Sequence, residues 1–356
     1  MNKSNVITRL SFILIAVFLI MLVIVPSCAK PAPAPAPTPA PKVKPIELKF
    51  AHTIPPTHWR PEKIWGSWTA TIQERTGGKV EFTMYPASSL LKGGEMIDGI
   101  ISGSTEIGEW STFHNAGRFP TWEVLNGPGI GLRSMETDSK MVWNIYNTFP
   151  EAKAEFDDVK LLGMWTIKSN CLWSLEPIRT LEDIKGKKIR ASAGAMAAGI
   201  EALGAVPQQV GYNDIYDALD KGVIDGAATN MQGPMPRRWY EVCKYVTKID
   251  CGNVIQLVAM NWDVWNGLPD DVKKTFEEYS GEWIVDACGR NGDEYEAYAE
   301  GISVENGVQI IELEPAELAK WAEILKEIPF QVAAKADANG IRGTEVIEEA
   351  FKFLGS

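Results

Sequence analysis

The stretch from Leu181 to Asn230 decides the fold, and it reads LEDIKGKKIRASAGAMAAGIEALGAVPQQVGYNDIYDALDKGVIDGAATN. Its apolar spacing predicts strands at 189–192, 206–210 and 224–229, separated by helices at 195–203 and 213–221. Strands that alternate with crossover helices are typical of a parallel α/β sheet. The stretch therefore predicts one complete α/β unit.

Arg190 lies at the end of the first of these strands, just before a loop rich in Ala and Gly. Ligands of open α/β sheets bind beyond the carboxyl ends of the strands. A guanidinium keeps its charge and offers two parallel N–H donors, which match a carboxylate. The pattern fits a carboxylate contact, and it fits a surface arginine beside Lys187 and Lys188 equally well.

A second α/β series precedes this stretch, with strands at 46–51, 80–85 and 106–111 and helices at 62–74 and 94–102. Further strands are predicted at 159–165, 171–175, 242–249, 254–261 and 308–313. The expected fold class is α/β, a two-lobed periplasmic-binding-protein clamshell. Lobe 1 spans 46–165 and is completed by 254–356, and lobe 2 spans 166–253. The glycine-rich segment 126–131 lacks the spacing of a phosphate loop and is predicted to be a surface loop.

The end of the chain is helical in pattern. Apolar residues at three- and four-residue steps predict a helix over 270–300, long enough at about 1.5 Å per residue to cross both lobes. Gly281, Gly289 and Gly292 leave a kink or a break as the alternative. A final amphipathic helix is predicted over 316–335.

The first 45 residues predict export. Residues 1–27 combine an early positive charge with the apolar run 10–25 and resemble a lipoprotein-type signal peptide, with Cys28 as the lipid-attachment residue. Residues 28–45 form a tether rich in Pro and Ala, which favours an extended spacer. An uncleaved signal anchor is the alternative. Both interpretations place the folded part outside the cytoplasm.

Composition narrows the function. The formal net charge of −11 argues against nucleic-acid binding, which needs a basic face. The 13 Trp residues indicate core packing, with pocket walls as a second use. Cys171, Cys243, Cys251 and Cys288 fit either disulfides or free buried thiols. The three His residues have no metal-ligand spacing, and no cofactor motif is evident.

Four segments together resemble one family: 181–190, Leu203–Ala205, 214–219 and Gly222–Gly226. They are similar to the extracytoplasmic solute-binding proteins of tripartite ATP-independent periplasmic (TRAP) transporters, of the DctP type. The resemblance covers roughly Ile46 to Phe353. It implies a receptor without enzymatic activity that binds a small organic carboxylate and delivers it to membrane transporter subunits. It implies no resident cofactor, although a divalent cation bridges the ligand carboxylate in some relatives.

The resemblance also implies site residues in lobe 2. Arg190 would pair with the ligand carboxylate, and Tyr212 would lie against the ligand, or else cap the following helix. Thr229 or Asn230 would supply a polar contact, because Ala227 and Ala228 stand where relatives often have Gln and Glu. Sialic-acid-binding relatives place a second cation near 168–170. Only Lys168 and no Arg occurs there, so sialic acid is disfavoured and Asn170 becomes the candidate at that place.

Loops of lobe 1 supply the remaining candidates, His52, Trp110 and Ser111, and Trp165 is a further possible wall. Each of the first three has a structural alternative, as a loop histidine, a core tryptophan and a strand-end cap. Two rival functions remain: a clamshell receptor for an ATP-driven importer or sensor kinase, and an extracytoplasmic enzyme. The sequence offers no GxSxG elbow and no Cys/His pair for the enzyme.

Overall fold

The computed structural model describes residues 44–131 and 133–355. The predictions for the signal peptide, Cys28 and nearly all of the tether concern residues 1–43 and lie outside this part. Among the described residues, no helix combines the length and apolarity that crossing a membrane would require.

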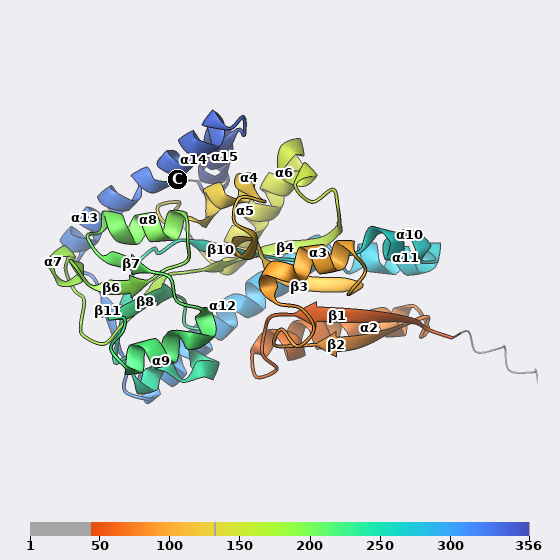
Figure 1. Cartoon of the computed structure of the whole chain (residues 1–356), viewed down its shortest axis with the longest axis horizontal. Coiled ribbons are helices and arrows are strands. Elements are labelled where there is room, and N and C mark those ends of the chain that lie inside the picture. The colour runs from red at the N-terminus through yellow and green to blue at the C-terminus, as the bar shows by residue number, and fades with distance from the viewer. Residues whose placement is uncertain (1–43, 132, 356) are drawn as a thin grey trace, which may run out of the picture. The chain divides into compact units, whose positions relative to one another are not determined.

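The first sheet has the strand order β2-β1-β3-β10-β4 (Figure 1). Strand β1 runs parallel to β2 and β3, whereas β10 is antiparallel to both β3 and β4. The bounds are β1 Ile46–His52, β2 Val80–Tyr85, β3 Ile107–Ser111, β4 Lys160–Lys168 and β10 Asn253–Met260. Strand β10 returns from far along the chain to lie between β3 and β4, so the first sheet is built from two separate parts of the sequence.

Helices cover both faces of the first sheet, and we call this assembly the first lobe. On one face, Trp110 and Leu257 pack with helices α3, α4, α5, α14 and α15; on the other, Phe50 and Trp165 pack with α2, α11 and α12. The bounds are α2 Ser67–Arg75, α3 Met96–Ile101, α4 Pro120–Glu123, α5 Met135–Thr148, α6 Pro150–Ala154, α10 Trp262–Gly267, α11 Asp270–Glu278, α12 Glu282–Glu305, α14 Glu327–Ala338 and α15 Gly343–Leu354. Burial on both faces explains why β4 and β10 are almost continuously apolar.

The second sheet has the order β11-β9-β5-β8-β6-β7. Its bounds are β5 Cys171–Ser174, β6 Lys188–Arg190, β7 Val206–Gln208, β8 Gly226–Thr229, β9 Tyr245–Lys248 and β11 Gln309–Glu312. Ile189 and Ala228 face α7 (Leu181–Ile184), α8 (Ala195–Ala202) and α13 (Pro315–Leu325), whereas Trp173 and Val246 face α9 (Ile215–Asp220). This sheet and its helices form the second lobe.

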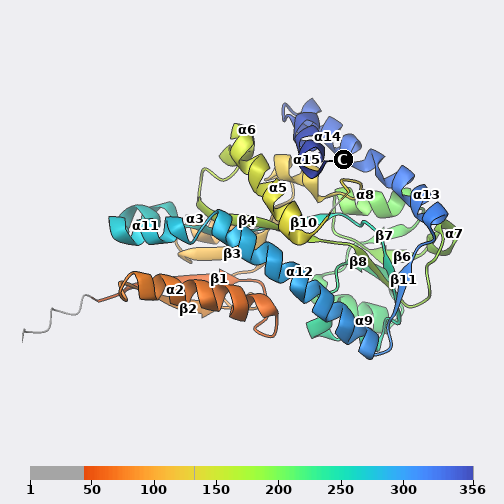
Figure 2. The ribbon, with the colours of Figure 1, turned by 180° about the vertical axis from the view of Figure 1, so that it is seen from behind.

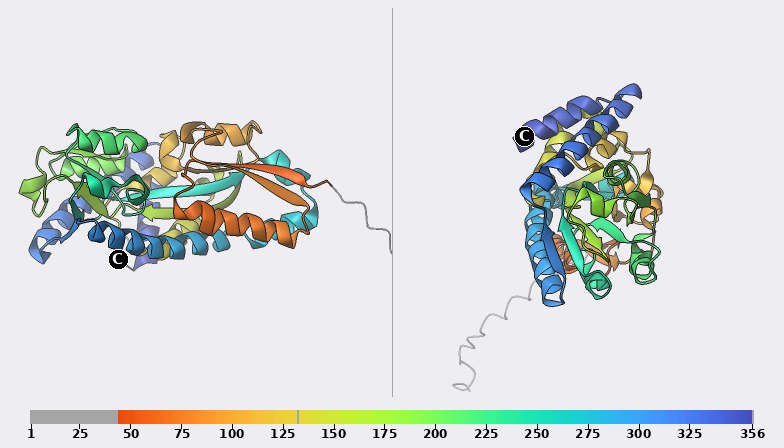
Figure 3. Two further views of the ribbon diagram at one scale, coloured as in Figure 1. Left: turned by 90° about the horizontal axis from the view of Figure 1, so that it is seen from below. Right: turned by 90° about the vertical axis from the view of Figure 1, so that its left-hand side faces the viewer.

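The long helix predicted over 270–300 is broken. Helix α11 ends at Glu278 and α12 begins at Glu282, because Gly281 takes a φ of +56° and donates its N–H to the carbonyl of Leu162. Helix α12 contributes to the cores of both lobes, through Ile284 in the first and Ala299 in the second. Its course past both sheets can be followed in Figures 2 and 3.

Three further predictions differ from the structure. Strand β11 pairs with β9 in the second sheet, so segment 254–356 does not belong wholly to the first lobe. The helix predicted over 316–335 is divided at Lys326 into α13 and α14, and α15 follows without having been predicted. Segment 126–131 is largely buried rather than a surface loop: its Gly129 N–H donates to the carboxylate of Asp250 at 2.8 Å.

Candidate functional site

A cavity of about 270 Å³ lies between the two lobes, at the ends of β1, β3, β6 and β8. Among the described residues that line it, none is an Asp or a Glu. Those from the first lobe and the strands that connect the lobes are Thr53, Ile54, Pro55, His58, Arg60, Ser88, Gly93, Ser111, Phe113, His114, Ile167, Val254 and Gln256. Those from the second lobe include Ser169, Arg190, Ser192, Met196, Tyr212, Asn213, Ala228, Thr229, Asn230, Gln232, Gly233 and Arg237.

Arg190 reaches this cavity from the last position of β6 and is 8% exposed. Its Nε donates to the carbonyl of Val210 at 3.2 Å, and its guanidinium carbon lies 5.5 Å from the ring centroid of Tyr212. Burial lowers the pKa of this guanidinium, which nevertheless stays charged because an arginine pKa lies far above neutrality. In the described part of the chain no carboxylate forms an ion pair with it. A buried cation without an anionic partner is unfavourable, so the site is suited to an anion.

Tyr212, Thr229 and Asn230 form one wall with Arg190. The Tyr212 hydroxyl and Thr229 Oγ1 are 3.3 Å apart, within hydrogen-bonding distance. Asn230 Oδ1 accepts the N–H of Gly233 at 2.9 Å, which fixes the amide and leaves its Nδ2 group as a donor. Tyr212 is among the residues that line the cavity, and its contact with a ligand stays a prediction.

Arg237 is a second cation in the cavity wall, which the sequence did not reveal. Its guanidinium carbon lies 4.8 Å from the ring centroid of Tyr212. The group donates to the carbonyl of Gly233 at 3.1 Å and to Asn213 Oδ1 at 3.2 Å, and both partners are neutral. Arg237 lies on the 3-10 turn Met235–Arg237, where no periodic pattern marks a side chain as facing the cavity.

The first lobe also brings a cation to the cavity, but this one is neutralised. Arg60 is 1% exposed and forms an ion pair with the buried Glu109, whose other oxygen accepts the Trp65 indole N–H at 2.7 Å. The neighbouring His58 is held neutral, because burial and, less strongly, the charges of Arg60 and Arg237 hold its pKa well below the usual value. The uncompensated positive charge of the cavity therefore belongs to the second lobe.

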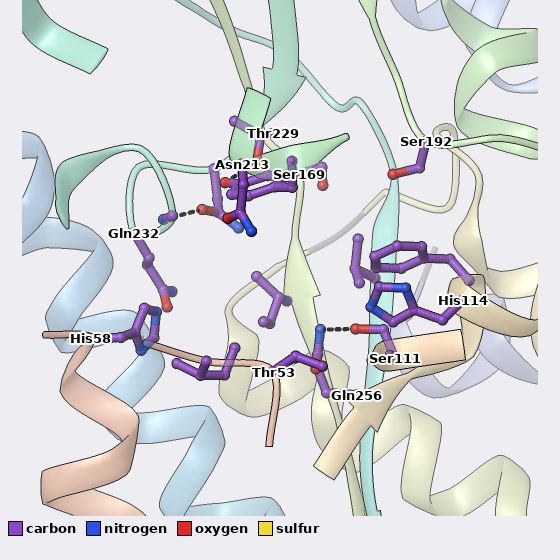
Figure 4. A pocket seen from close by; sticks show the side chains of 18 of the residues that line it. Thr53, His58, Ser111, His114, Ser169, Ser192, Asn213, Thr229, Gln232 and Gln256 are labelled. Atoms are coloured by element: carbon purple, nitrogen blue, oxygen red, sulfur yellow. Dashed lines mark hydrogen bonds between the residues drawn. The ribbon is translucent and has the colours of Figure 1, made fainter. Parts of the chain in front are cut away.

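The polar groups of the first lobe lie opposite (Figure 4). Gln256 on β10 donates from Nε2 to the hydroxyl of Ser111, with His114 beside that pair. His58 and Gln232 lie on the other side of the cavity. Among the predicted residues, the cavity thus brings together Arg190, Tyr212, Thr229, Asn230 and Ser111.

The other predicted residues do not line the cavity. Trp110 is fully buried in the core on one face of the first sheet, and Trp165 is 1% exposed in the core on the other face, with Arg60 over its ring. His52 is also buried, at 1% exposure and beside Phe50. Asn170 accepts a contact from the thiol of Cys171 at 3.3 Å. The four cysteines among the described residues are free and buried.

Two α/β lobes around a cavity with an uncompensated arginine define the class of two-lobed solute-binding proteins. The chain belongs to the bacterial extracellular solute-binding protein family 7 (DctP), whose model matches residues 50–335. The predicted resemblance, the two-lobed α/β fold and the function of a solute receptor are thereby confirmed, and membership places the folded part outside the cytoplasm.

Individual relatives agree with this assignment. The chain is 27% identical over 305 residues to the C4-dicarboxylate-binding periplasmic protein DctP of Rhodobacter capsulatus, covering 84% of this chain and 90% of the relative. A TRAP solute-binding protein of Rhodoferax ferrireducens, solved with copurified benzoate, superposes with a TM-score of 0.80 at 23% identity, covering 87% of this chain and 98% of that one. A mandelate-bound TRAP protein of Bordetella bronchiseptica gives 0.78 at 22% identity, covering 86% and 98%.

Proposed function

We propose that this protein binds a small organic carboxylate in the cavity between its lobes, with Arg190 as the anion contact, and delivers it to a TRAP-type membrane transporter. The single observation that carries the proposal is the state of Arg190, which is buried, charged and without an acidic partner in the described part of the chain. Relatives named for dicarboxylates, benzoate and mandelate support the same ligand class.

The arrangement suggests how binding would proceed. A carboxylate meets Arg190 in the second lobe, with Tyr212 and the Asn230 amide beside it. Ser111 and Gln256 of the first lobe then meet the other end of the ligand. Closure excludes water and strengthens the ion pair, because the pair then lies in a medium of lower effective dielectric constant. We also propose that a lipid on Cys28 holds the receptor at the membrane.

Ligand affinity in the variant Arg190→Lys tests the proposal. Native mass spectrometry of the purified protein first identifies a copurifying acid, and calorimetry then measures affinity for benzoate and for that acid. We expect a loss of roughly 10- to 100-fold, because an ammonium cannot reproduce the two parallel hydrogen bonds of the guanidinium.

The matched control is Arg238→Lys, since Arg238 is exposed, forms an ion pair with Glu241 and does not line the cavity. This control should bind as the wild type does. If Arg190→Lys also bound every acid with wild-type affinity, or if no carboxylate bound the wild type, the proposed function would be wrong.

A further inference from the structure

The second lobe presents two cations, Arg190 and Arg237, to one cavity. A contact between Arg190 and a single carboxylate gives Arg237 no role. The ring centroid of Tyr212 lies 5.5 Å from the guanidinium carbon of Arg190 and 4.8 Å from that of Arg237. The two guanidinium carbons can therefore be no farther apart than the sum of these distances, about 10 Å. Both side chains line the same cavity.

No carboxylate of the described residues 44–131 and 133–355 forms an ion pair with Arg190 or Arg237. The partners of Arg237 are the Gly233 carbonyl and the Asn213 amide oxygen, which orient the guanidinium but leave its charge intact. No Asp or Glu occurs among the described residues that line the cavity. Two like charges at this separation in a partly buried site repel each other, and a ligand with two negative groups relieves that repulsion.

Arg60 also lines the cavity but differs from Arg190 and Arg237 in having a carboxylate partner. The buried carboxylate of Glu109 neutralises it. The described part of the chain thus supplies an internal anion for the cation of the first lobe and none for the two of the second lobe. That difference is expected if the counter-charge of the second lobe arrives with the ligand.

Building on the proposed function, we infer that Arg237 is a second anion contact and determines selectivity for a small ligand with two acidic groups over its analogue with one. Arg190 takes one carboxylate, and Arg237 takes the other acidic group across the ring of Tyr212. A separation of at most about 10 Å suits one small molecule, since each pair closes to N···O contacts of roughly 2.7–2.9 Å. The ring of Tyr212 between the two cations favours a flat or short ligand backbone.

The experiment compares matched ligand pairs, phthalate with benzoate and succinate with butyrate, on the full folded receptor by calorimetry at fixed ionic strength. In the wild type we expect the dianion of at least one pair to bind about tenfold or more tightly than its monoanion. Arg237→Gln should abolish that ratio and change the affinity for the monoanion by less than about twofold.

Two variants serve as controls. Arg238→Gln removes the same charge from the adjacent residue, which is exposed and outside the cavity, and should retain the wild-type ratio. Arg237→Lys keeps the charge without the fork and should retain part of the ratio. Thermal unfolding of each variant without ligand verifies that the protein is folded.

The outcomes separate the two proposals. If the wild type binds carboxylates in an Arg190-dependent way, but Arg237→Gln weakens both members of a pair equally or neither of them, the inference about Arg237 is overturned and the proposed function stands. The inference about Arg237 is also overturned if the wild type prefers the dianion in neither ligand pair. If no carboxylate binds the wild type, the proposed function itself fails.

Discussion

The indole Nε1 of Trp59 donates a hydrogen bond of 3.0 Å to Oε1 of Gln232, a residue 173 positions further along the chain. Trp59 belongs to the loop that follows β1 in the first lobe, and Gln232 to the loop that follows β8 in the second. The same Gln232 amide donates from Nε2 to the carbonyl of Gly292 on α12, at 3.1 Å. One side chain therefore joins both lobes and the helix that runs along them.

Trp59→Phe should weaken ligand binding by roughly 3- to 10-fold, the effect of losing one buried neutral hydrogen bond that exists only when the lobes are together. Titration calorimetry with the tightest-binding acid measures this effect. Trp265→Phe is the matched control, because Trp265 is equally buried in the same core (6% exposed) but takes no part in this hydrogen bond between the lobes. Equal losses in both variants would show that the effect comes from core packing rather than from the hydrogen bond between lobes.

Trp110→Ala should destabilise the protein rather than affect the ligand directly. Trp110 is fully buried among the side chains of the first core and does not line the cavity. Removing a buried indole costs about 3–5 kcal/mol in the free energy of unfolding, which urea denaturation measures. Trp262→Ala, at a position that is 37% exposed, should cost clearly less. A stable Trp110→Ala protein with impaired binding would contradict this placement.

The contribution of Asp138 to stability should fall as the pH rises from about 4 to about 7. His52, His58 and His114, whose pKa values burial lowers, contribute in the opposite direction below about pH 6.5. Burial raises the pKa of Asp138 from 3.8 to about 7, so in this window the folded protein keeps a proton that the unfolded chain has released. The unfolded state therefore binds fewer protons, and the free energy of unfolding decreases with pH, by up to about 1.4 kcal/mol per pH unit for one such group.

Asp138→Asn removes this contribution, so the free energy of unfolding of the wild type minus that of the variant, measured by urea denaturation, should decrease as the pH rises. Burial also raises the pKa of Glu155 to about 7, so part of the slope remains in the variant. A profile as steep as that of the wild type would mean that Asp138 does not keep its proton in the folded state.

Gly129→Ala should be strongly destabilising. Gly129 has a φ of +95°, and a Cβ atom there would lie 2.2 Å from the carbonyl oxygen of Leu325, at the junction of α13 and α14. Gly117→Ala is the control for backbone strain alone: its φ is +80°, with nothing within 4 Å of the added carbon. The control should cost about 1–2 kcal/mol of unfolding free energy, and Gly129→Ala clearly more. If both variants lost the same free energy of unfolding, the clash with the Leu325 carbonyl would not be the cause.

The sequence predicted the two α/β series well, because apolar residues recur at different intervals in strands and in helices. Each crossover helix showed its interval clearly. It placed Arg190 beside a cavity because the carboxyl ends of strands share one edge of a sheet. It could not tell Trp110 or Trp165 from pocket walls, since in a sheet covered on both faces large apolar residues are buried on either side and their pattern does not mark the cavity. It missed Arg237 because that residue lies on a short turn, where only the folded chain determines which way a side chain points.

Helix α12 is held at two places by contacts of different kinds. At Gly289 and Gly292 an added Cβ would lie within 2.8 Å of atoms of Glu136 and Met135, so this part fits closely against α5 of the first lobe. One turn later the buried Glu296 carboxylate accepts the N–H groups of Met231, at 2.9 Å, and Gln232, at 3.3 Å, in the loop of the second lobe. Any opening of the cavity must then flex the helix between Gly292 and Glu296 or detach one of its ends. That single turn is therefore the part of α12 that a change in the angle between the lobes would bend.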